Sequence, residues 1–97
     1  MKKYDWYSDP RHGWMKVKRA ELIDLGIEKE ITGYSYQRGE FVYLEEDLDA
    51  FTFMKALEEK TGTKFDTDKH LRHHIADRMS KIRSYPSYKY NGGTNEI

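Results

Sequence analysis

The chain has 97 residues, enough for one domain with a modest hydrophobic core. Its 17 Lys and Arg side chains balance 17 Asp and Glu side chains, which excludes a protein that coats DNA through overall positive charge. The absence of cysteine excludes a disulfide framework, a cysteine-based zinc site and a thiol nucleophile.

The N-terminal third predicts two short strands and a short helix. Trp6 and Tyr7 form a β-prone run that stops in the turn-rich segment 8–13. Residues 14–18 alternate between apolar and polar side chains, as a half-buried strand does. Residues 19–25 carry apolar side chains at helical spacing, and a glycine follows where a left-handed residue ends a helix.

The middle of the chain predicts a β-hairpin followed by a helix. Two β-prone runs flank the turn residues 37–39, and Gly39 suits a position with positive φ. The second run, 41–44, is apolar on both faces, which is typical of a central or covered strand. A helix is then expected from Asp47, as its N-terminal cap, to the vicinity of Gly62.

The C-terminal third predicts a second long helix, from a cap within residues 66–68 to about Ser84. Pro86 cannot continue this helix, and residues 91–97 are expected to form a flexible tail. The expected apolar stripe of the helix consists of Leu71, Ile75, Met79 and Ile82.

This order of elements predicts the α+β class, with a small antiparallel sheet of three to four strands. Two to three helices are expected to pack mainly on one face of that sheet, in a single domain that spans residues 1–90. The predicted core consists of Trp14, Val17, Leu22, Ile23, Val42, Leu44, Phe53, Leu57, Ile75 and Met79.

The first charged residues precede Tyr4 and Asp5 rather than an apolar run, so no secretory signal is expected. No window approaches the roughly 20 apolar residues that a membrane span needs. We therefore expect a cytoplasmic protein that does not enter a membrane.

The best candidate for a metal site lies on the second predicted helix. His70, His74 and Asp77 are spaced so that a helix would place them on one face, together with His73. The zinc-protease signature is absent because no Glu separates the histidines. The simpler interpretation is a solvated polar helix face, so neither a metal nor another cofactor is expected.

Cations and tyrosines accumulate toward the C-terminus, where residues 61–97 hold seven Lys and Arg against four acids. Arg and Tyr are favoured in protein–protein contacts, and cations beside aromatic rings also suit phosphates and stacked bases. An ordinary solvated helix and a tail that covers the sheet would explain the same pattern. The candidate partner-binding residues are Tyr34, Tyr36, Arg38, Arg72, Arg78, Lys81, Arg83, Tyr85 and Tyr88.

The middle of the chain carries an acidic patch of Glu45, Glu46, Asp47 and Asp49. Such a patch suggests a divalent-ion site or a surface that mimics DNA, but four carboxylates are few for phosphate mimicry. The simpler interpretation is that these acids are solvated at the end of a strand and that one of them caps the following helix. Near the N-terminus, Asp9 and His12 suggest an acid–base pair, but a turn opened by Asp9 is the simpler expectation.

Four strings of residues are unusual enough to carry a resemblance. Together they resemble a group of small accessory proteins carried by phages, prophages and plasmids, over nearly the whole chain. That group has no assigned activity, so the resemblance implies no catalytic residue. It implies a context in which small proteins bind and disable host defence machinery, as anti-CRISPR proteins do. The strings are Asp9-Pro10-x-His12-Gly13-Trp14-x-Lys16-Val17, Tyr34-Ser35-Tyr36, Tyr43-Leu44-Glu45-Glu46-Asp47-x-Asp49-Ala50 and Ile82-Arg83-Ser84-Tyr85.

These observations favour a non-enzymatic binding module, an inhibitor of a host protein or nucleoprotein complex. One alternative is a nucleic-acid-binding accessory protein that uses the basic C-terminal helix. Another is a metal-dependent hydrolase that uses the His-rich helix. The oligomeric state and the strand order stay open.

Overall fold

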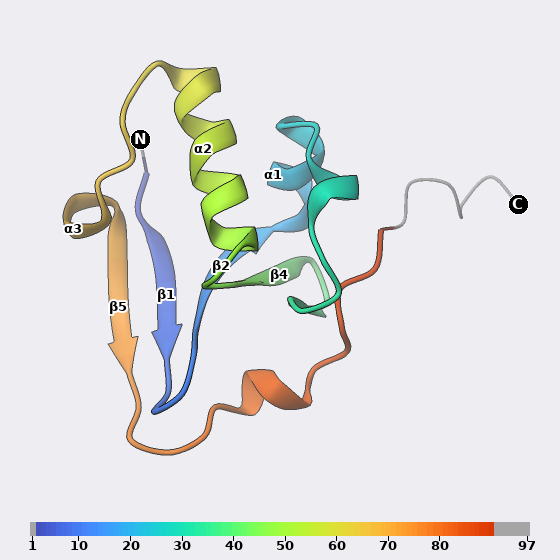
Figure 1. Ribbon diagram of the computed structural model, residues 1–97, viewed down its shortest axis with the longest axis vertical. Coiled ribbons are helices and arrows are strands. Elements are labelled where there is room, and N and C mark those ends of the chain that lie inside the picture. The colour runs from blue at the N-terminus through green and yellow to red at the C-terminus, as the bar shows by residue number, and fades with distance from the viewer. Residues whose placement is uncertain (1, 91–97) are drawn as a thin grey trace, which may run out of the picture.

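The computed structural model describes residues 2–90, which form one five-stranded sheet with three α-helices and two short 3₁₀ helices, η1 and η2 (Figure 1). The elements in chain order are β1 (Tyr4–Ser8), β2 (Gly13–Lys18), α1 (Arg19–Asp24), η1 (Glu28–Glu30), β3 (Tyr36–Arg38), β4 (Phe41–Glu45), α2 (Asp49–Thr61), α3 (Thr67–His70), β5 (Leu71–Ile75) and η2 (Lys81–Ser84).

The sheet has the strand order β3-β4-β2-β1-β5. Neighbouring strands are antiparallel except β1 and β5, which are parallel and lie side by side at one edge (Figure 1). The predicted α+β class is therefore confirmed. The sheet is larger than expected, and it is mixed rather than antiparallel, because β5 joins the edge that β1 would otherwise leave open.

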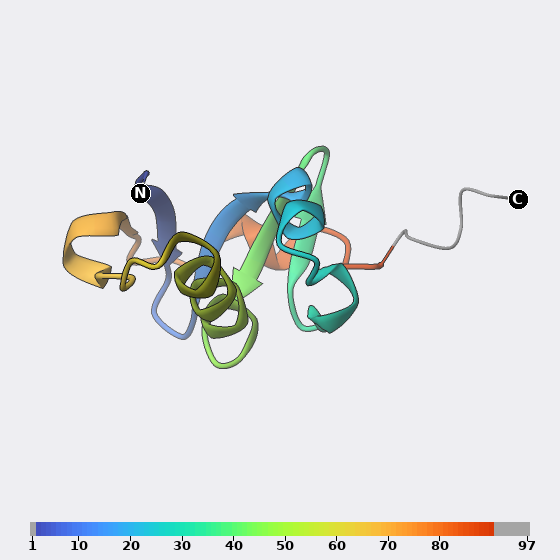
Figure 2. The same cartoon turned by 90° about the horizontal axis from the view of Figure 1, so that it is seen from above.

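One face of the sheet packs against α1 and α2 over a hydrophobic core in which most of the buried side chains are aliphatic. Alternation along the strands turns Met15 and Val17 of β2, and Val42 and Leu44 of β4, toward the helices. Phe53 of α2 is fully buried among them. Figure 2 shows α2 end-on against this side of the sheet.

The other face carries an aromatic cluster, in which Trp14 and Tyr43 are buried. Ile82 and Tyr85, from η2 and the residue after it, pack on this cluster and cover part of the face. The β4 strand is thus buried on both faces, as its apolar pattern predicts.

The predicted helix over residues 66–84 is wrong. Asp66 caps a helix by accepting hydrogen bonds from the N–H groups of Asp68 and Lys69, but that helix ends at His70. The chain then pairs with β1 as a strand, and this pairing brings Leu71 into the core. His and β-branched Ile are weak helix formers, so the β1 edge determines the conformation here.

The core prediction is correct for its six strand and helix residues Trp14, Val17, Leu22, Val42, Leu44 and Phe53. It is wrong for Ile75, whose exposure of 83% follows from the loss of the predicted helix, and for Met79 and Ile23, which are also exposed. Leu57 is partly buried at the edge of the core.

The predicted cap of α2 is also wrong, because Leu48 rather than Asp47 precedes the helix. The Glu45 carboxylate satisfies the start of the helix instead: it accepts hydrogen bonds from the N–H groups of Asp47, Leu48 and Asp49 at 2.7–2.8 Å. The expected stop holds, since Gly62 adopts φ of 73° at the C-terminal end.

The C-terminal strap, residues 85–90, docks along β3. The N–H of Gln37 donates to Pro86 O, and the N–H of Tyr88 donates to Ser35 O, both at 2.8 Å. The Tyr88 side chain is buried, and its hydroxyl donates to the Glu28 carbonyl at 2.7 Å. The predicted flexible tail, 91–97, lies outside the described residues. Within residues 2–90, no helix is long and apolar enough to cross a bilayer.

Candidate functional site

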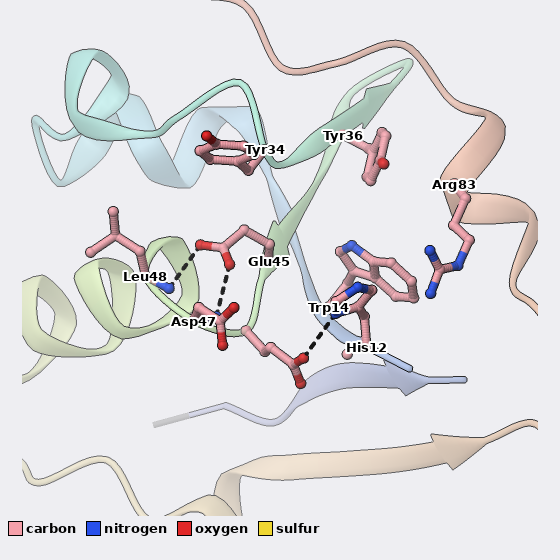
Figure 3. A pocket seen from close by; sticks show the side chains of 10 residues that line it. His12, Trp14, Tyr34, Tyr36, Glu45, Asp47, Leu48 and Arg83 are labelled. Atoms are coloured by element: carbon pink, nitrogen blue, oxygen red, sulfur yellow. Dashed lines mark hydrogen bonds and ion pairs between the residues drawn. The ribbon is translucent and has the colours of Figure 1, made fainter. Parts of the chain in front are cut away.

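A pocket of about 400 Å³ opens at the end of the sheet where β2 and β3 begin and β4 ends (Figure 3). It joins two sets of residues that the sequence presents separately: the tyrosines before β3 and the acids after β4. Its lining consists of His12, Gly13, Trp14, Tyr34, Tyr36, Glu45, Glu46, Asp47, Leu48 and Arg83.

Trp14 forms the floor of the pocket and is only 2% exposed. Its ring lies 6.3 Å from the ring of Tyr36 in an edge-on arrangement. Among residues 2–90 its indole N–H has no hydrogen-bond acceptor, and Figure 3 shows the nitrogen facing the space between Tyr34 and Tyr36. Because this N–H faces the pocket (Figure 3), the floor presents a donor to an occupant.

The two tyrosine walls are held by a buried polar network beneath them. Ser35 and Asp49 are fully buried. The Ser35 hydroxyl donates to Asp49 Oδ2 at 2.6 Å and accepts the N–H of Glu45 at 3.0 Å. This network binds Ser35, which lies between Tyr34 and Tyr36, to Asp49 of α2 and Glu45 of β4. Tyr34 projects outward and is 79% exposed, while Tyr36 is half-buried on β3.

The same carboxylate, Asp49 Oδ2, also accepts the N–H and hydroxyl of Thr32, at 3.0 and 2.7 Å. Asp49 therefore orders the loop before β3 rather than forming part of an exposed acidic patch. Its second oxygen, Oδ1, has no partner in the described part of the chain and is enclosed by protein.

The rim of the pocket is acidic. Glu46 Oε2 lies 3.3 Å from Nδ1 of His12, and both side chains are partly exposed. Asp47 is exposed and its carboxylate makes no ion pair within residues 2–90, whereas both oxygens of Glu45 bind the start of α2. Of the predicted acidic patch, Asp47 thus remains unpaired within residues 2–90, and Glu46 lies at the rim in contact with His12.

A buried ion pair fixes the opposite side of the pocket. Nε of Arg83 donates to Asp9 Oδ2 at 2.7 Å, and Nη2 donates to Oδ1 at 3.1 Å. The hydrogen bond from Arg83 outweighs burial and holds the pKa of Asp9 well below its usual range. Asp9 also accepts backbone N–H groups of Arg11, His12 and Ser80, so it opens a turn, as expected, and binds η2 to it.

The remaining predicted partner-binding residues do not share one surface. Arg38 donates to the Tyr85 hydroxyl at 3.0 Å beside the aromatic cluster, and Arg72 pairs with Asp5. Tyr88 lies in the core. Arg78 follows β5 and Lys81 begins η2, both exposed, so the single basic helix face expected for nucleic acid does not exist.

The residues of the weak metal candidate do not share one helix face, because the predicted helix over residues 66–84 does not form. His70 ends α3, where its Nδ1 accepts the N–H of Asp66 at 2.9 Å. His74 lies on β5 with Nε2 2.9 Å from Asp5 Oδ1, and Asp77 lies in the following loop. Within residues 2–90 no group of three or more potential ligands converges on a metal position.

The sequence does not indicate that Trp14 forms the floor of the pocket or that His12 lies at its rim. No local pattern identifies either role, because both depend on the register between β2 and β4, which sets Trp14 opposite Glu45. Comparison with protein-family models, with curated proteins and with solved structures gave no match at a level that indicates relatedness.

Proposed function

We propose that this protein is a non-enzymatic binding module whose pocket accepts a basic side chain of a host protein or nucleoprotein complex. The observation that carries the proposal is the combination of aromatic walls, an acidic rim and an indole donor without an acceptor. Aromatic faces attract Lys and Arg cations, and nearby carboxylates add to that attraction. The indole N–H of Trp14 supplies a donor for a backbone carbonyl of the same segment.

The proposed occupant also explains how binding would inhibit a partner. Proteins that bind nucleic acids expose Lys and Arg at their working surfaces. A small protein that holds one of these side chains in an acidic pocket removes it from its nucleic acid. This mode of action agrees with the resemblance to accessory proteins of mobile elements.

The test follows the two indole N–H signals by NMR during titration with N-acetyl-arginine amide. We expect the Trp14 signal to shift and saturate, with a dissociation constant on the order of 1–10 mM for so small a probe. The Trp6 signal serves as an internal control, because that N–H is already bonded to Ser8 Oγ at 3.0 Å. The uncharged analogue N-acetyl-citrulline amide is expected to produce no saturable shift.

A matched pair of variants locates the binding. Tyr34→Ala removes an exposed wall and is expected to weaken binding several-fold, while Phe51→Ala, which removes an exposed aromatic ring on α2, leaves it unchanged. Equal responses to the arginine and citrulline probes would refute the proposal. The same pair, used as baits in host lysate, should differ in the proteins that they retain.

A further inference from the structure

The sheet face turned away from α1 and α2 places cations next to aromatic rings. The register sets Lys16 opposite Asp5 on one side and Tyr43 on the other. One row further along, Phe41 is paired with Lys18 on β2 and with Arg38 on β3. Because paired residues share a face, these side chains form two adjacent rows across the sheet.

Positive charge dominates these rows. Asp5 is the one carboxylate in them, and Nε of Arg72 donates to its Oδ1 at 2.9 Å. The bonds from Arg72 and His74 lower the pKa of Asp5, so it stays ionised and neutralises one cation. The ammonium and guanidinium groups of Lys16, Lys18 and Arg38 remain in excess.

A depression of about 230 Å³ lies beside the first of these side chains. Lys16, Phe41 and Arg72 line it, together with Lys2 and Lys3 from the start of the chain. The acids in its lining are already engaged, since Glu21 pairs with Lys2 at 3.3 Å and Asp5 pairs with Arg72. The depression therefore presents a positive potential to a ligand.

Aromatic rings on this face are partly uncovered. Phe41 is half-buried, and the ammonium of Lys16 lies 4.1 Å from the centre of its ring. Tyr7 is also half-buried, but His74 already stacks on its ring, with ring centres 4.7 Å apart and planes 17° from parallel. Each base of an unpaired nucleic acid has a face that can stack on such rings, while its phosphate needs a neighbouring cation.

We propose that this face binds single-stranded nucleic acid, with a base on Phe41 and phosphates on Lys16, Lys18 and Arg38. A duplex offers its phosphates but hides the base faces, so an aromatic sheet surface favours unpaired strands. The acidic pocket takes a cation at the end of the sheet, while the basic rows take an anion on its face.

The test measures fluorescence anisotropy of a labelled 12-nucleotide oligo-dT at 50 and 200 mM salt. We expect micromolar binding at low salt that weakens at high salt, since phosphate contacts release counterions. Lys16→Ala/Lys18→Ala is expected to lose about tenfold in affinity and to flatten the salt dependence. The control Lys55→Ala/Lys64→Ala removes two exposed lysines in and after α2 and should change affinity less than about twofold.

Phe41→Leu separates stacking from charge, and it is expected to lose about five- to tenfold in affinity for the oligonucleotide. Circular dichroism establishes whether each variant is folded. If Phe41→Leu does not fold, the comparison of Lys16→Ala/Lys18→Ala with Lys55→Ala/Lys64→Ala still decides the test. Equal losses in both lysine pairs would overturn the proposal. The proposal would also be overturned if a duplex or an anionic phosphatidylserine vesicle bound as tightly as the single strand and Phe41→Leu changed none of these affinities. Tyr34→Ala should leave oligonucleotide binding intact, so the two proposals fail separately.

Discussion

The two faces of the sheet differ in what covers them and in the side chains that they carry. Toward the helices, Met15 and Val42 are fully buried among aliphatic neighbours and Phe53. On the opposite face, Trp14 and Tyr43 are buried by η2 and its neighbours, yet charged and aromatic side chains beside them reach the surface. The helix face therefore stabilises the fold by apolar burial, and the opposite face presents charged and aromatic groups to solvent.

The largest effect should come from the helix face. Phe53→Ala removes a fully buried ring and is expected to lower the free energy of unfolding by about 3–5 kcal/mol, a large share of the stability of a small domain. Urea denaturation followed by circular dichroism measures the loss. Phe51→Ala, at a ring 62% exposed on the same helix, is the control and should change stability by less than about 0.5 kcal/mol. Similar losses in both variants would contradict the division between the faces.

A smaller effect is expected where η2 is bound to the opposite face. Asp9→Asn breaks the pair with Arg83 and should lower the free energy of unfolding by about 2–3 kcal/mol. The loss is smaller than for a fully buried ion pair because part of the Arg83 side chain is exposed to water. Asp24→Asn, which breaks an exposed pair with Lys60, is the control with little expected change.

The contribution of Asp9 should also depend on pH with a definite sign. Its folded pKa lies below the unfolded value of about 3.9, so the ionised carboxylate stabilises the fold above that pH. That stability is lost as pH falls through the folded pKa. The difference in urea midpoint between wild type and Asp9→Asn should therefore stay constant from about pH 7 to pH 5 and shrink below about pH 4. A difference that grows in acid would show that the pair is not formed.

The smallest of these effects is expected at Ser35, which links the pocket walls to the core. Ser35→Ala leaves a buried carboxylate oxygen of Asp49 with one fewer donor and the N–H of Glu45 without its acceptor. We expect the free energy of unfolding to fall by about 1–2 kcal/mol. The Trp14 indole N–H signal should also shift less on titration with N-acetyl-arginine amide. Ser87→Ala, on the exposed strap, is the control. Lost stability without any effect on the probe would show that the walls do not depend on this network.

Local rules were sufficient for the middle of the chain. Gly39 and Gly62 adopt the positive φ angles that their positions predict, and β4 shows the two-sided burial that its residues imply. The turn begins two residues later than expected, because Gln37 and Arg38 belong to β3. Such signals lie within a few residues of the structure that they determine.

The C-terminal third and the pocket depend on contacts between distant residues. The spacing of Leu71, Ile75 and Ile82 fits a helix, and only the edge of β1 turns the first two into a strand. The pair of Asp9 and Arg83 joins residues 74 positions apart. Neither pairing leaves a periodic signal in the sequence. Tyr34 and Tyr36 could therefore be predicted as candidate binding residues, but their position beside Trp14 in one pocket could not.

The strap along β3 has a consequence for how separate copies of the molecule behave toward one another. Gln37 on β3 and Ser35 just before it have backbone groups at the open edge of the sheet, and Pro86 and Tyr88 form hydrogen bonds with them within the same chain. A polypeptide shortened before Pro86 would expose these groups as a template for intermolecular β-pairing. The strap thus protects the sheet edge against aggregation, and fusions at this terminus should begin beyond Tyr90.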